Sequence, residues 1–244
     1  DAHFLIDDNA SLDSDYVKQI KTEYPGVFYD RFILGLWKSA EGIIYKPFAD
    51  NPARYIVDNI SRDDNGRPSP PLSLATIGVD FGGNGSATAF VCTGITRGFR
   101  QVITLDEYYH KGIVTPTEQE EAFVAFARAC LDHGYPVAEV YCDSAEQTLI
   151  HGFRRAAMAA RLPMSIRNAR KGPINDRIRF YARLMGADRY KVLHHCTHTI
   201  EALSTAVWSS KSPTKDVRLD DGSYNIDSLD AMEYSTEPYM ATII

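Results

Sequence analysis

The sequence lacks the features that mark membrane proteins, secreted proteins and phosphate-loop ATPases. No hydrophobic run approaches the length of a membrane span, and the N-terminus has none of the basic and apolar regions of a signal peptide. No stretch fits the pattern G-x-x-x-x-G-K-S/T, in which backbone N–H groups and a lysine hold the phosphates of ATP. We therefore expect a soluble chain that does not itself contain a phosphate-loop ATPase site.

Cysteine is scarce, and its spacing excludes the common cysteine-based metal sites. Three of the four cysteines lie inside apolar strand or helix patterns, and no C-x-x-C spacing occurs among Cys92, Cys130, Cys142 and Cys196. This pattern is typical of reduced core residues in a cytoplasmic protein. The stretch 194–198 (H-H-C-T-H) groups possible zinc ligands, but its spacing is wrong for a zinc finger and no second ligand pair comes after it.

Charge is unevenly distributed along the chain. The formal net charge is −6, which taken alone argues against binding to nucleic acid. Between Arg154 and Lys191, however, eleven lysines and arginines stand against two acids, which gives this region a balance of +9 and leaves −15 for the remainder. The sequence therefore predicts one basic patch on an otherwise acidic protein.

The N-terminal part of the chain differs in composition from the rest. Residues 11–23 combine a capping start with apolar spacing, which predicts a short amphipathic helix. A second helical stretch, dense in aromatics, is expected over 27–37, and an extended segment over 41–48. The polar run 62–71 is rich in turn formers, so we expect a domain boundary there.

From Leu74 onwards, strand patterns come first and helices then alternate with strands. Strands are expected over 74–80, 87–96, 101–109, 137–143, 164–168 and 191–195, and helices over 115–134, 146–161, 174–187 and 197–209. Three meandering strands followed by βαβ alternation predict an α/β fold with a mixed sheet flanked by helices. A hairpin is expected over 216–225, and a helix from Asp227.

Asp80 ends a short apolar strand pattern and is followed by a glycine-rich turn. Residues 76–80 predict a buried strand, and Gly82, Gly83 and Gly85 permit a tight turn with positive φ before the next strand. A carboxylate at the mouth of such a hairpin is accessible to a ligand yet held by a rigid sheet. The alternative is a structural role, in which Asp80 only caps the turn.

Two further aspartates are expected at the ends of elements. Asp143 comes after the fourth strand and could instead cap the helix that begins near Glu146. Asp230 lies on the first turn of the helix that begins at Asp227, where a solvated carboxylate is the commonest role. If these two converge with the carboxylate of Asp80, their mutual repulsion calls for a cation, so the three predict a divalent metal site.

Four motifs succeed one another along the chain in a recognisable order. They are G-V-D-F-G-G at 78–83, D-E-Y-Y-H at 106–110, Y-C-D-S-A-E at 141–146 and D-x-x-D-A-x-x-Y at 227–234. In this order and spacing, the chain resembles the C-terminal nuclease domain of the large terminase subunit, the DNA-packaging motor of tailed bacteriophages. The aromatic stretch 28–45 is similar to the segment that joins the ATPase to the nuclease in that family.

The resemblance implies a ribonuclease H-like nuclease domain over 74–244. Residues 1–60 would then be a linker segment from the ATPase side, and 61–73 a flexible connection. The implied activity is endonucleolytic cutting of double-stranded concatemeric viral DNA during genome packaging, in the cytoplasm of the host. The implied partners are double-stranded DNA and, in a full-length protein, an ATPase domain, the small terminase subunit and the portal, with no membrane.

The resemblance also implies a two-metal hydrolytic mechanism. Asp80, Asp143 and Asp230 would be the catalytic residues and would hold two Mg²⁺ or Mn²⁺ ions. Relatives carry histidine at the position of Asp227, so the role of this residue is open: a fourth metal ligand, an outer-shell base or an N-cap of its helix.

Within the basic region, four side chains surround a strand-to-helix connection that could lead phosphates to the metals. These expected DNA-binding residues are Arg167, Arg170, Lys171 and Arg177. No stripe of exposed aromatics is expected beside them, so we predict contacts to the DNA backbone and not base reading.

Two rival interpretations stay open. A strand followed by D-F-G-G at 80–83 is also similar to the phosphate-gripping turn of actin-like and sugar-kinase folds, which predicts nucleotide binding and phosphotransfer. Such folds need two domains and a second glycine-rich turn, whereas Ser-Ala-Glu comes after Asp143. The non-enzymatic rival is a DNA-gripping module of the packaging motor, which predicts DNA binding without metal-dependent cutting.

Overall fold

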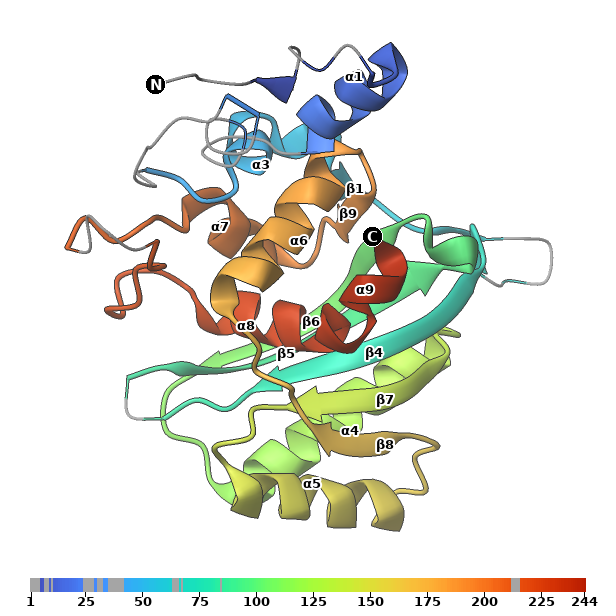
Figure 1. Cartoon of the computed structure of the whole chain (residues 1–244). Helices are drawn as coiled ribbons and strands as arrows, with labels where there is room; N and C mark the ends of the chain where they lie inside the picture. The colour runs from blue at the N-terminus through green and yellow to red at the C-terminus, as the bar shows by residue number, and fades with distance from the viewer. Residues whose placement is uncertain are drawn as a thin grey trace.

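The computed structural model describes residues 5–6, 9, 11–23, 29, 33–34, 42–62, 66, 68–83, 85–211 and 216–244. Most of them form an α/β fold in which helices cover both faces of one mixed sheet (Figure 1). The predicted fold class is therefore confirmed. The helix expected over 27–37 lies largely outside the described residues.

Seven strands form the sheet in the spatial order β1-β9-β6-β5-β4-β7-β8. β5 is antiparallel to β4 and β6, and the other neighbouring pairs are parallel. The expected strands agree with this sheet, except that β1 was not predicted. The bounds are β1 (Ile56–Val57), β4 (Leu72–Asp80), β5 (Ala87–Thr96), β6 (Val102–Lys111), β7 (Val137–Cys142), β8 (Ser165–Asn168) and β9 (Tyr190–Leu193). A separate two-stranded ribbon pairs β2 (Ser61–Arg62) with β3 (Pro68–Ser69).

The helices expected over 11–23, 115–134, 146–161, 174–187 and 197–209 and from Asp227 are present, with differences at their ends, whereas α3 and α9 were not predicted. Their bounds are α1 (Ser14–Glu23), α3 (Lys46–Asp50), α4 (Pro116–Asp132), α5 (Gln147–Ala159), α6 (Ile174–Gly186), α7 (Thr197–Thr205), α8 (Asp227–Thr236) and α9 (Met240–Ile243), with 3₁₀ turns η2 (Pro52–Arg54), η3 (Arg97–Phe99) and η4 (Glu237–Tyr239). The predicted capping box of α4 is present, since Thr115 and Glu118 bond to each other's backbone N–H. Within the described residues, no helix is both long and apolar enough to cross a membrane.

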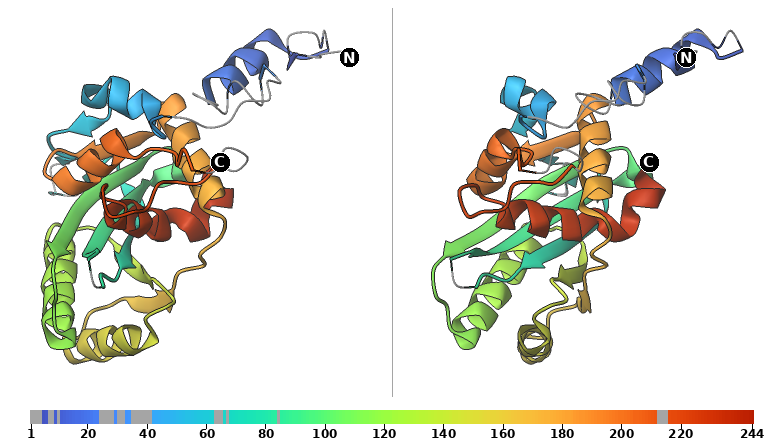
Figure 2. Two further views of the ribbon diagram at one scale, coloured as in Figure 1. Left: turned by 90° about the vertical axis from the view of Figure 1, so that its left-hand side faces the viewer. Right: turned by 60° about the vertical axis from the view of Figure 1, so that its left-hand side comes forward.

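Two apolar cores lie on opposite faces of the sheet, as Figure 2 shows from the positions of the helices. On one face, α4 and α5 pack against the strands, and the rings of Phe123 and Phe153 stack 4.4 Å apart. On the other face, α6, α7 and α8 cover the strands around buried residues such as Tyr181 and Met232. Burial on both faces explains why β5 shows no alternation of apolar and exposed polar residues, since every one of its residues is buried, its three threonines included.

The segment before β4 belongs to the same core as the sheet. Tyr45, Phe48 and Tyr55 are almost completely buried, and β1 pairs with β9. The prediction of an extended segment over 41–48 is wrong for its last residues, because α3 begins at Lys46. Pro47 lies in the first turn of this helix, where proline is favourable. The predicted division of the chain at 61–73 stays a prediction, although residues 44–57 and 74–244 share a core.

The hairpin expected over 216–225 is not formed. Arg218 instead makes an isolated antiparallel bridge with Trp208, and residues 221–224 form a bend. The same contact shortens the helix expected over 197–209, because the chain leaves α7 at Ala206 to form the bridge. The consequence for function is that Arg218 is buried and does not lie on an exposed turn.

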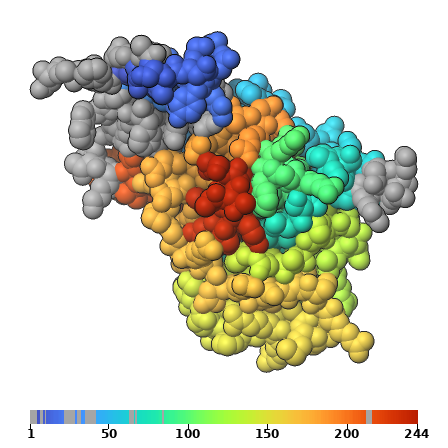
Figure 3. Space-filling view, turned by 45° about the vertical axis from the view of Figure 1, so that its right-hand side comes forward, coloured from blue at the N-terminus to red at the C-terminus, as the bar shows by residue number. Residues whose placement is uncertain are grey.

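The C-terminal residues are tied to the far edge of the sheet by one arginine. The Arg189 guanidinium donates to the carbonyl oxygens of Phe99 and Ile243, each at 2.6 Å, and to that of Arg100 at 2.8 Å. Figure 3 shows the result at the surface, where the C-terminal residues (red) lie between α6 (orange) and the residues near position 100 (green). The bond from Arg189 to Ile243 thus fixes the end of the chain that comes after α8.

α8 packs on β4 at a distance that only glycine permits. A Cβ on Gly78 would lie 1.7 Å from the carbonyl oxygen of Ala231, so no other residue fits without displacing the helix. One helical turn later, the Thr76 hydroxyl donates to the Ser235 carbonyl oxygen at 2.7 Å. Because Ala231 meets Gly78 and Ser235 meets Thr76, α8 runs antiparallel to β4, and its first turn lies at the carboxyl end of that strand.

Gly78→Ala should therefore destabilise the protein severely. Overpacking a core usually costs about 1–3 kcal/mol, and a methyl group placed against backbone atoms should reach or exceed the upper value. Urea unfolding would measure the loss, with Gly83→Ala as the control, since a Cβ there meets only the Ser86 hydroxyl at 4.0 Å. Equal stabilities of the two variants would contradict the close approach of α8.

Candidate active site

Asp80 and Asp143 lie side by side at one edge of the sheet. β4 and β7 are parallel neighbours with Val79 opposite Cys142, and the Asp143 N–H donates to the Val79 carbonyl oxygen at 2.9 Å. Both aspartates therefore stand at the carboxyl ends of adjacent parallel strands, where the sheet opens toward a ligand. The predicted hairpin turn comes directly after Asp80, with Gly85 at a φ of 102°.

The first turn of α8 brings two more carboxylates to the same edge. The position of Asp230 results from the packing of Ala231 on Gly78, and Asp227 Oδ2 accepts the Ala87 N–H at 2.9 Å. Asp227 thus spans from α8 to the start of β5 and closes the mouth of the β4–β5 hairpin. The N-cap interpretation of Asp227 is wrong, because the N-cap position of α8 is Ile226, Asp227 is the first helical residue, and its Oδ2 accepts an N–H of β5.

The electrostatics of Asp80 show that the aspartates act on one another. Burial raises the pKa of Asp80 well above its ordinary value, and the charges of Asp230, Asp227 and Asp143 raise it further, in that order. The Lys171 ammonium opposes this shift. The four aspartates therefore lie close enough to form one acidic site, whereas their role as metal ligands stays a prediction.

Cationic side chains hold two of these carboxylates. Lys171 Nζ lies 2.8 Å from Asp143 Oδ1, and Arg218 Nη2 lies 2.6 Å from Asp230 Oδ1. Arg177 Nη2 approaches the same Asp230 oxygen at 3.6 Å. The repulsion expected of clustered carboxylates is therefore partly neutralised by the protein itself.

Glu233 is a buried member of this site that was not predicted. It is completely buried, and this burial raises its pKa while Arg218 and Arg177 oppose the rise. Arg218 Nη1 lies 2.8 Å from Glu233 Oε1, and the Tyr45 hydroxyl donates to the same oxygen at 3.2 Å. The sequence spacing could have revealed Glu233, because Asp227, Asp230 and Glu233 follow one another at intervals of three residues and so share a side of the helix.

The residues present fit a divalent metal in chemistry. Asp80, Asp143 and Asp230 offer hard carboxylate oxygens, which Mg²⁺ and Mn²⁺ prefer, and their mutual effect on the pKa of Asp80 marks a deficit of positive charge. In the described part of the chain, however, no three His, Cys, Asp or Glu side chains form a group that could hold a metal ion. Lys171 and Arg218 each form an ion pair with one of these carboxylates.

The expected DNA-binding residues divide into exposed and buried ones. Arg170 and Lys171 are exposed on the connection between β8 and α6, and Arg167 Nη2 lies 3.0 Å from Glu139 Oε1 with 61% of its side chain exposed. Arg177 is different, since only 4% of its side chain is exposed and its guanidinium lies 5.1 Å from the centre of the Tyr234 ring. Arg177 instead forms ion pairs with Asp230 and Glu233, two carboxylates of α8.

The histidines of the 194–198 stretch have separate partners. His194 Nδ1 lies 2.9 Å from the Asp58 carbonyl oxygen, His195 Nε2 lies 3.5 Å from Asp106 Oδ1, and the ring of His198 stacks on that of Tyr109. All four cysteines of the chain are free and buried, as predicted.

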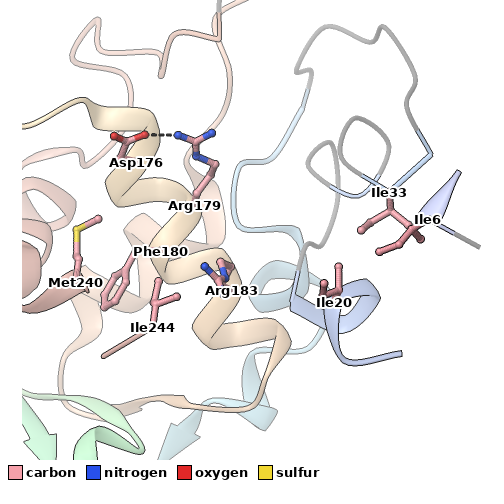
Figure 4. Close-up of a pocket in the computed structure, with 9 residues that line it drawn as sticks. All are labelled: Ile6, Ile20, Ile33, Asp176, Arg179, Phe180, Arg183, Met240 and Ile244. Carbon is pink, nitrogen blue, oxygen red and sulfur yellow. Dashed lines mark hydrogen bonds and ion pairs between the residues drawn. The ribbon is translucent and has the colours of Figure 1, made fainter. Parts of the chain in front are cut away.

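Two cavities help to delimit the site. One of about 550 Å³ is lined by residues of the turn before β5, the end of β6, α7 and 220–227, Asp227 included. The other, of about 620 Å³, lies between α1, α6 and the C-terminal residues, and none of the four site aspartates lines it. Figure 4 shows its lining, which is largely apolar: Ile6, Ile20, Ile33, Asp176, Arg179, Phe180, Arg183, Met240 and Ile244.

Comparison with known proteins identifies the fold. No protein-family model and no curated protein sequence matches the chain. Among solved structures, the large terminase of a thermophilic bacteriophage matches with a TM-score of 0.77 and 25% identity, over 97% of this chain and 54% of that one. This chain thus spans about half the length of that relative.

Isolated terminase nuclease domains match as well. The nuclease domain of the bacteriophage SPP1 large terminase, solved with bound Mn, has a TM-score of 0.52 and 17% identity over 75% of this chain and 94% of that one. The large terminase nuclease of the thermophilic phage G20c, solved with bound magnesium, has a TM-score of 0.52 and 16% identity over 80% of this chain and 96% of that one. The chain therefore has the fold of a large terminase nuclease domain, and the resemblance seen in its sequence is confirmed.

Asp80→Asn should stabilise the metal-free protein at neutral pH. Because the pKa of Asp80 is higher in the folded than in the unfolded chain, its ionisation lowers stability as pH rises from the unfolded value through the folded one. The variant removes that loss, so its melting temperature in EDTA should exceed that of the unmodified protein by about 2–4 °C per kcal/mol. Below about pH 4 the gain should disappear, since the unfolded aspartate is then protonated too.

The matched control for this melt is Asp50→Asn, which alters an exposed carboxylate paired with Lys46. Asp50→Asn should not raise the melting temperature at neutral pH. A lower melting temperature of Asp80→Asn would instead show that the Asp80 charge is structural.

Arg218→Met should be strongly destabilising. The substitution leaves Glu233, which is fully buried, and Asp230 without their shortest ion pair, and breaking one side of a buried pair costs about 3–5 kcal/mol. Arg155→Met removes a cation that is 77% exposed and paired with Glu120, so it should cost at most about 1 kcal/mol. Urea unfolding of both variants would measure the difference, and similar losses would argue against a buried network.

Proposed function

We propose that the chain is a divalent-metal-dependent endonuclease that cuts double-stranded, concatemeric viral DNA during genome packaging. The observation that carries the proposal is the acidic site, in which the charges of Asp230 and Asp143 raise the pKa of Asp80. Three separate elements contribute these carboxylates to one edge of the sheet. The likeness in fold to terminase nucleases, two of them solved with Mn or magnesium, supports the same activity.

Asp80, Asp143 and Asp230 would hold the metal. Two bound Mg²⁺ or Mn²⁺ ions would supply an acidified water as the nucleophile and would stabilise the charge on the leaving 3′ oxygen. Arg218 and Arg177 orient Asp230 through their ion pairs, so that its carboxylate is held at the edge of the sheet. Asp227 would act as a fourth ligand or an outer-shell base, with its Oδ2 already oriented by the Ala87 N–H.

The DNA backbone would approach along the connection between β8 and α6. Arg167 and Arg170 expose their guanidinium groups there, and Lys171 reaches from the same connection to Asp143. Guanidinium groups bind phosphate oxygens without reading sequence, so little sequence preference is expected. Arg177 would contribute indirectly, by fixing Asp230.

The proposed role in packaging includes partners outside this chain. The large terminase that matches along about half of its own length has also been solved in complex with ATP-gamma-S. We propose that an ATPase domain, the small terminase subunit and the portal act with this chain inside the host cell. The cut itself would need no ATP, because hydrolysis of a phosphodiester uses water as the acceptor.

Plasmid cleavage tests the proposal. Supercoiled plasmid should be nicked and linearised with Mg²⁺ or Mn²⁺, without ATP, and EDTA should stop the reaction. Asp143→Asn and Asp230→Asn should each reduce the rate by at least about 10²-fold, since each removes a charge that the metal needs. Asp50→Asn, which alters an exposed surface carboxylate, is the matched control and should cut normally.

The same assay separates the rivals. Binding of DNA without any metal-dependent cutting would favour the DNA-gripping module, and activity that depends on ATP would favour phosphotransfer. Cutting that survives EDTA would contradict the metal-dependent mechanism.

A further inference from the structure

Glu237 holds the connection that carries Lys171. This glutamate begins η4, directly after α8, and only 8% of it is exposed. Its Oε2 accepts the Lys171 N–H at 3.0 Å, and its Oε1 accepts the Gly172 N–H at 2.5 Å. One buried carboxylate therefore binds two consecutive backbone N–H groups of the chain between β8 and α6.

The conformation of the connection depends on that contact. Lys171 has a φ of 53°, in the left-handed region that residues other than glycine rarely adopt. Such a conformation costs free energy and persists only where its surroundings enforce it. A Cβ on Gly172 would lie 2.9 Å from Glu237 Oε1, so the carboxylate approaches the backbone closely because residue 172 is glycine.

The other end of the connection is tied to the strand that carries Asp143. The Ala169 N–H donates to the Cys142 carbonyl oxygen at 2.7 Å, and Ala169 is buried. The backbone on which the Lys171 side chain starts is therefore held at 169 and at 171–172. From there the Lys171 ammonium lies 2.8 Å from Asp143 Oδ1, with 40% of the lysine and 17% of the aspartate side chain exposed.

We propose that Glu237 is a positioning residue that keeps the Lys171 ammonium on Asp143, where it balances the acidic site in the metal-free protein and competes with a divalent cation for that carboxylate. This inference rests on the proposed function, since Asp143 is a metal ligand only in that function. It assigns to Glu237 and Lys171 a control over metal affinity. Cutting would then depend on a cation concentration that displaces the lysine.

Direct metal binding tests this competition without recourse to cleavage. Mn²⁺ binding would be measured by isothermal titration calorimetry for the unmodified protein, Lys171→Met and Lys171→Arg. Lys171→Met should bind about fivefold more tightly, as expected for loss of a partly exposed pair worth about 1 kcal/mol. Lys171→Arg keeps the positive charge and should bind close to the unmodified value. Lys46→Met, which changes an exposed lysine paired with Asp50, is the matched control and should not change the affinity.

A double-mutant cycle tests the role of Glu237. Glu237→Gln places an amide NH₂ against one of the two backbone N–H groups, so the connection should be released and Mn²⁺ affinity should rise as in Lys171→Met. The double variant should bind no more tightly than Lys171→Met alone, because both changes remove the same interaction. A merely structural role of Glu237 would lower the melting temperature without increasing the affinity.

Unchanged or weaker Mn²⁺ binding by Lys171→Met would overturn the inference, as would a gain in Glu237→Gln that adds to that of Lys171→Met. If Glu237→Gln does not fold, Gly172→Ala replaces it, since its methyl group disturbs the same contact. Failure of the unmodified protein and Lys171→Met alike to bind Mn²⁺ would contradict the proposed function itself.

Discussion

The close approach of α8 to β4 is the contact on which the rest of the acidic site depends. Gly78 allows the helix backbone to lie against the strand, and the contact between Thr76 and Ser235 sets the direction of the helix. The first turn of α8 consequently meets the end of β4, so that Asp230 faces Asp80. Any side chain at position 78 would push α8 away from this strand, and with it the first turn that carries Asp230.

Charge compensation is the second constraint, and the basic region supplies much of it. Four aspartates and a buried glutamate lie around one edge of the sheet, while Lys171 and Arg177 from the basic region and Arg218 from the loop before α8 approach them. The basic region therefore has two roles that its sequence alone does not separate. Arg167 and Arg170 face solvent at the proposed path of the DNA backbone, whereas Arg177 is buried and stabilises the carboxylates.

The segment before β4 contributes to the same network. Tyr45 is completely buried and donates its hydroxyl to Glu233, which lies one helical turn after Asp230. β1 adds a strand beside β9, so residues 44–57 share the core that supports α8. Movement of this segment would therefore act on Glu233 through a short path of buried side chains. This connection gives the stretch that resembles the ATPase–nuclease linker a physical contact with the proposed nuclease site.

The sequence by itself predicted the α/β class and the order of the main strands and helices, because apolar periodicity and turn residues are local signals. It also placed Asp80, Asp143 and Asp230 at the ends of elements, and their role as metal ligands stays a prediction. Local signals also misled: residues 216–225 suggested a hairpin, but Arg218 pairs with Trp208 and with carboxylates of α8. The sequence left open whether Asp227 is a helix cap or a metal ligand, because its hydrogen-bond partner Ala87 lies 140 residues away in the sequence.

Only the tertiary structure revealed the contacts of Tyr45, Arg177, Glu233 and Glu237, since the partners of each are distant in sequence. Local sequence patterns can reveal the candidate carboxylates of such a site. The cationic side chains that pair with them are brought there only by the packing of the folded chain.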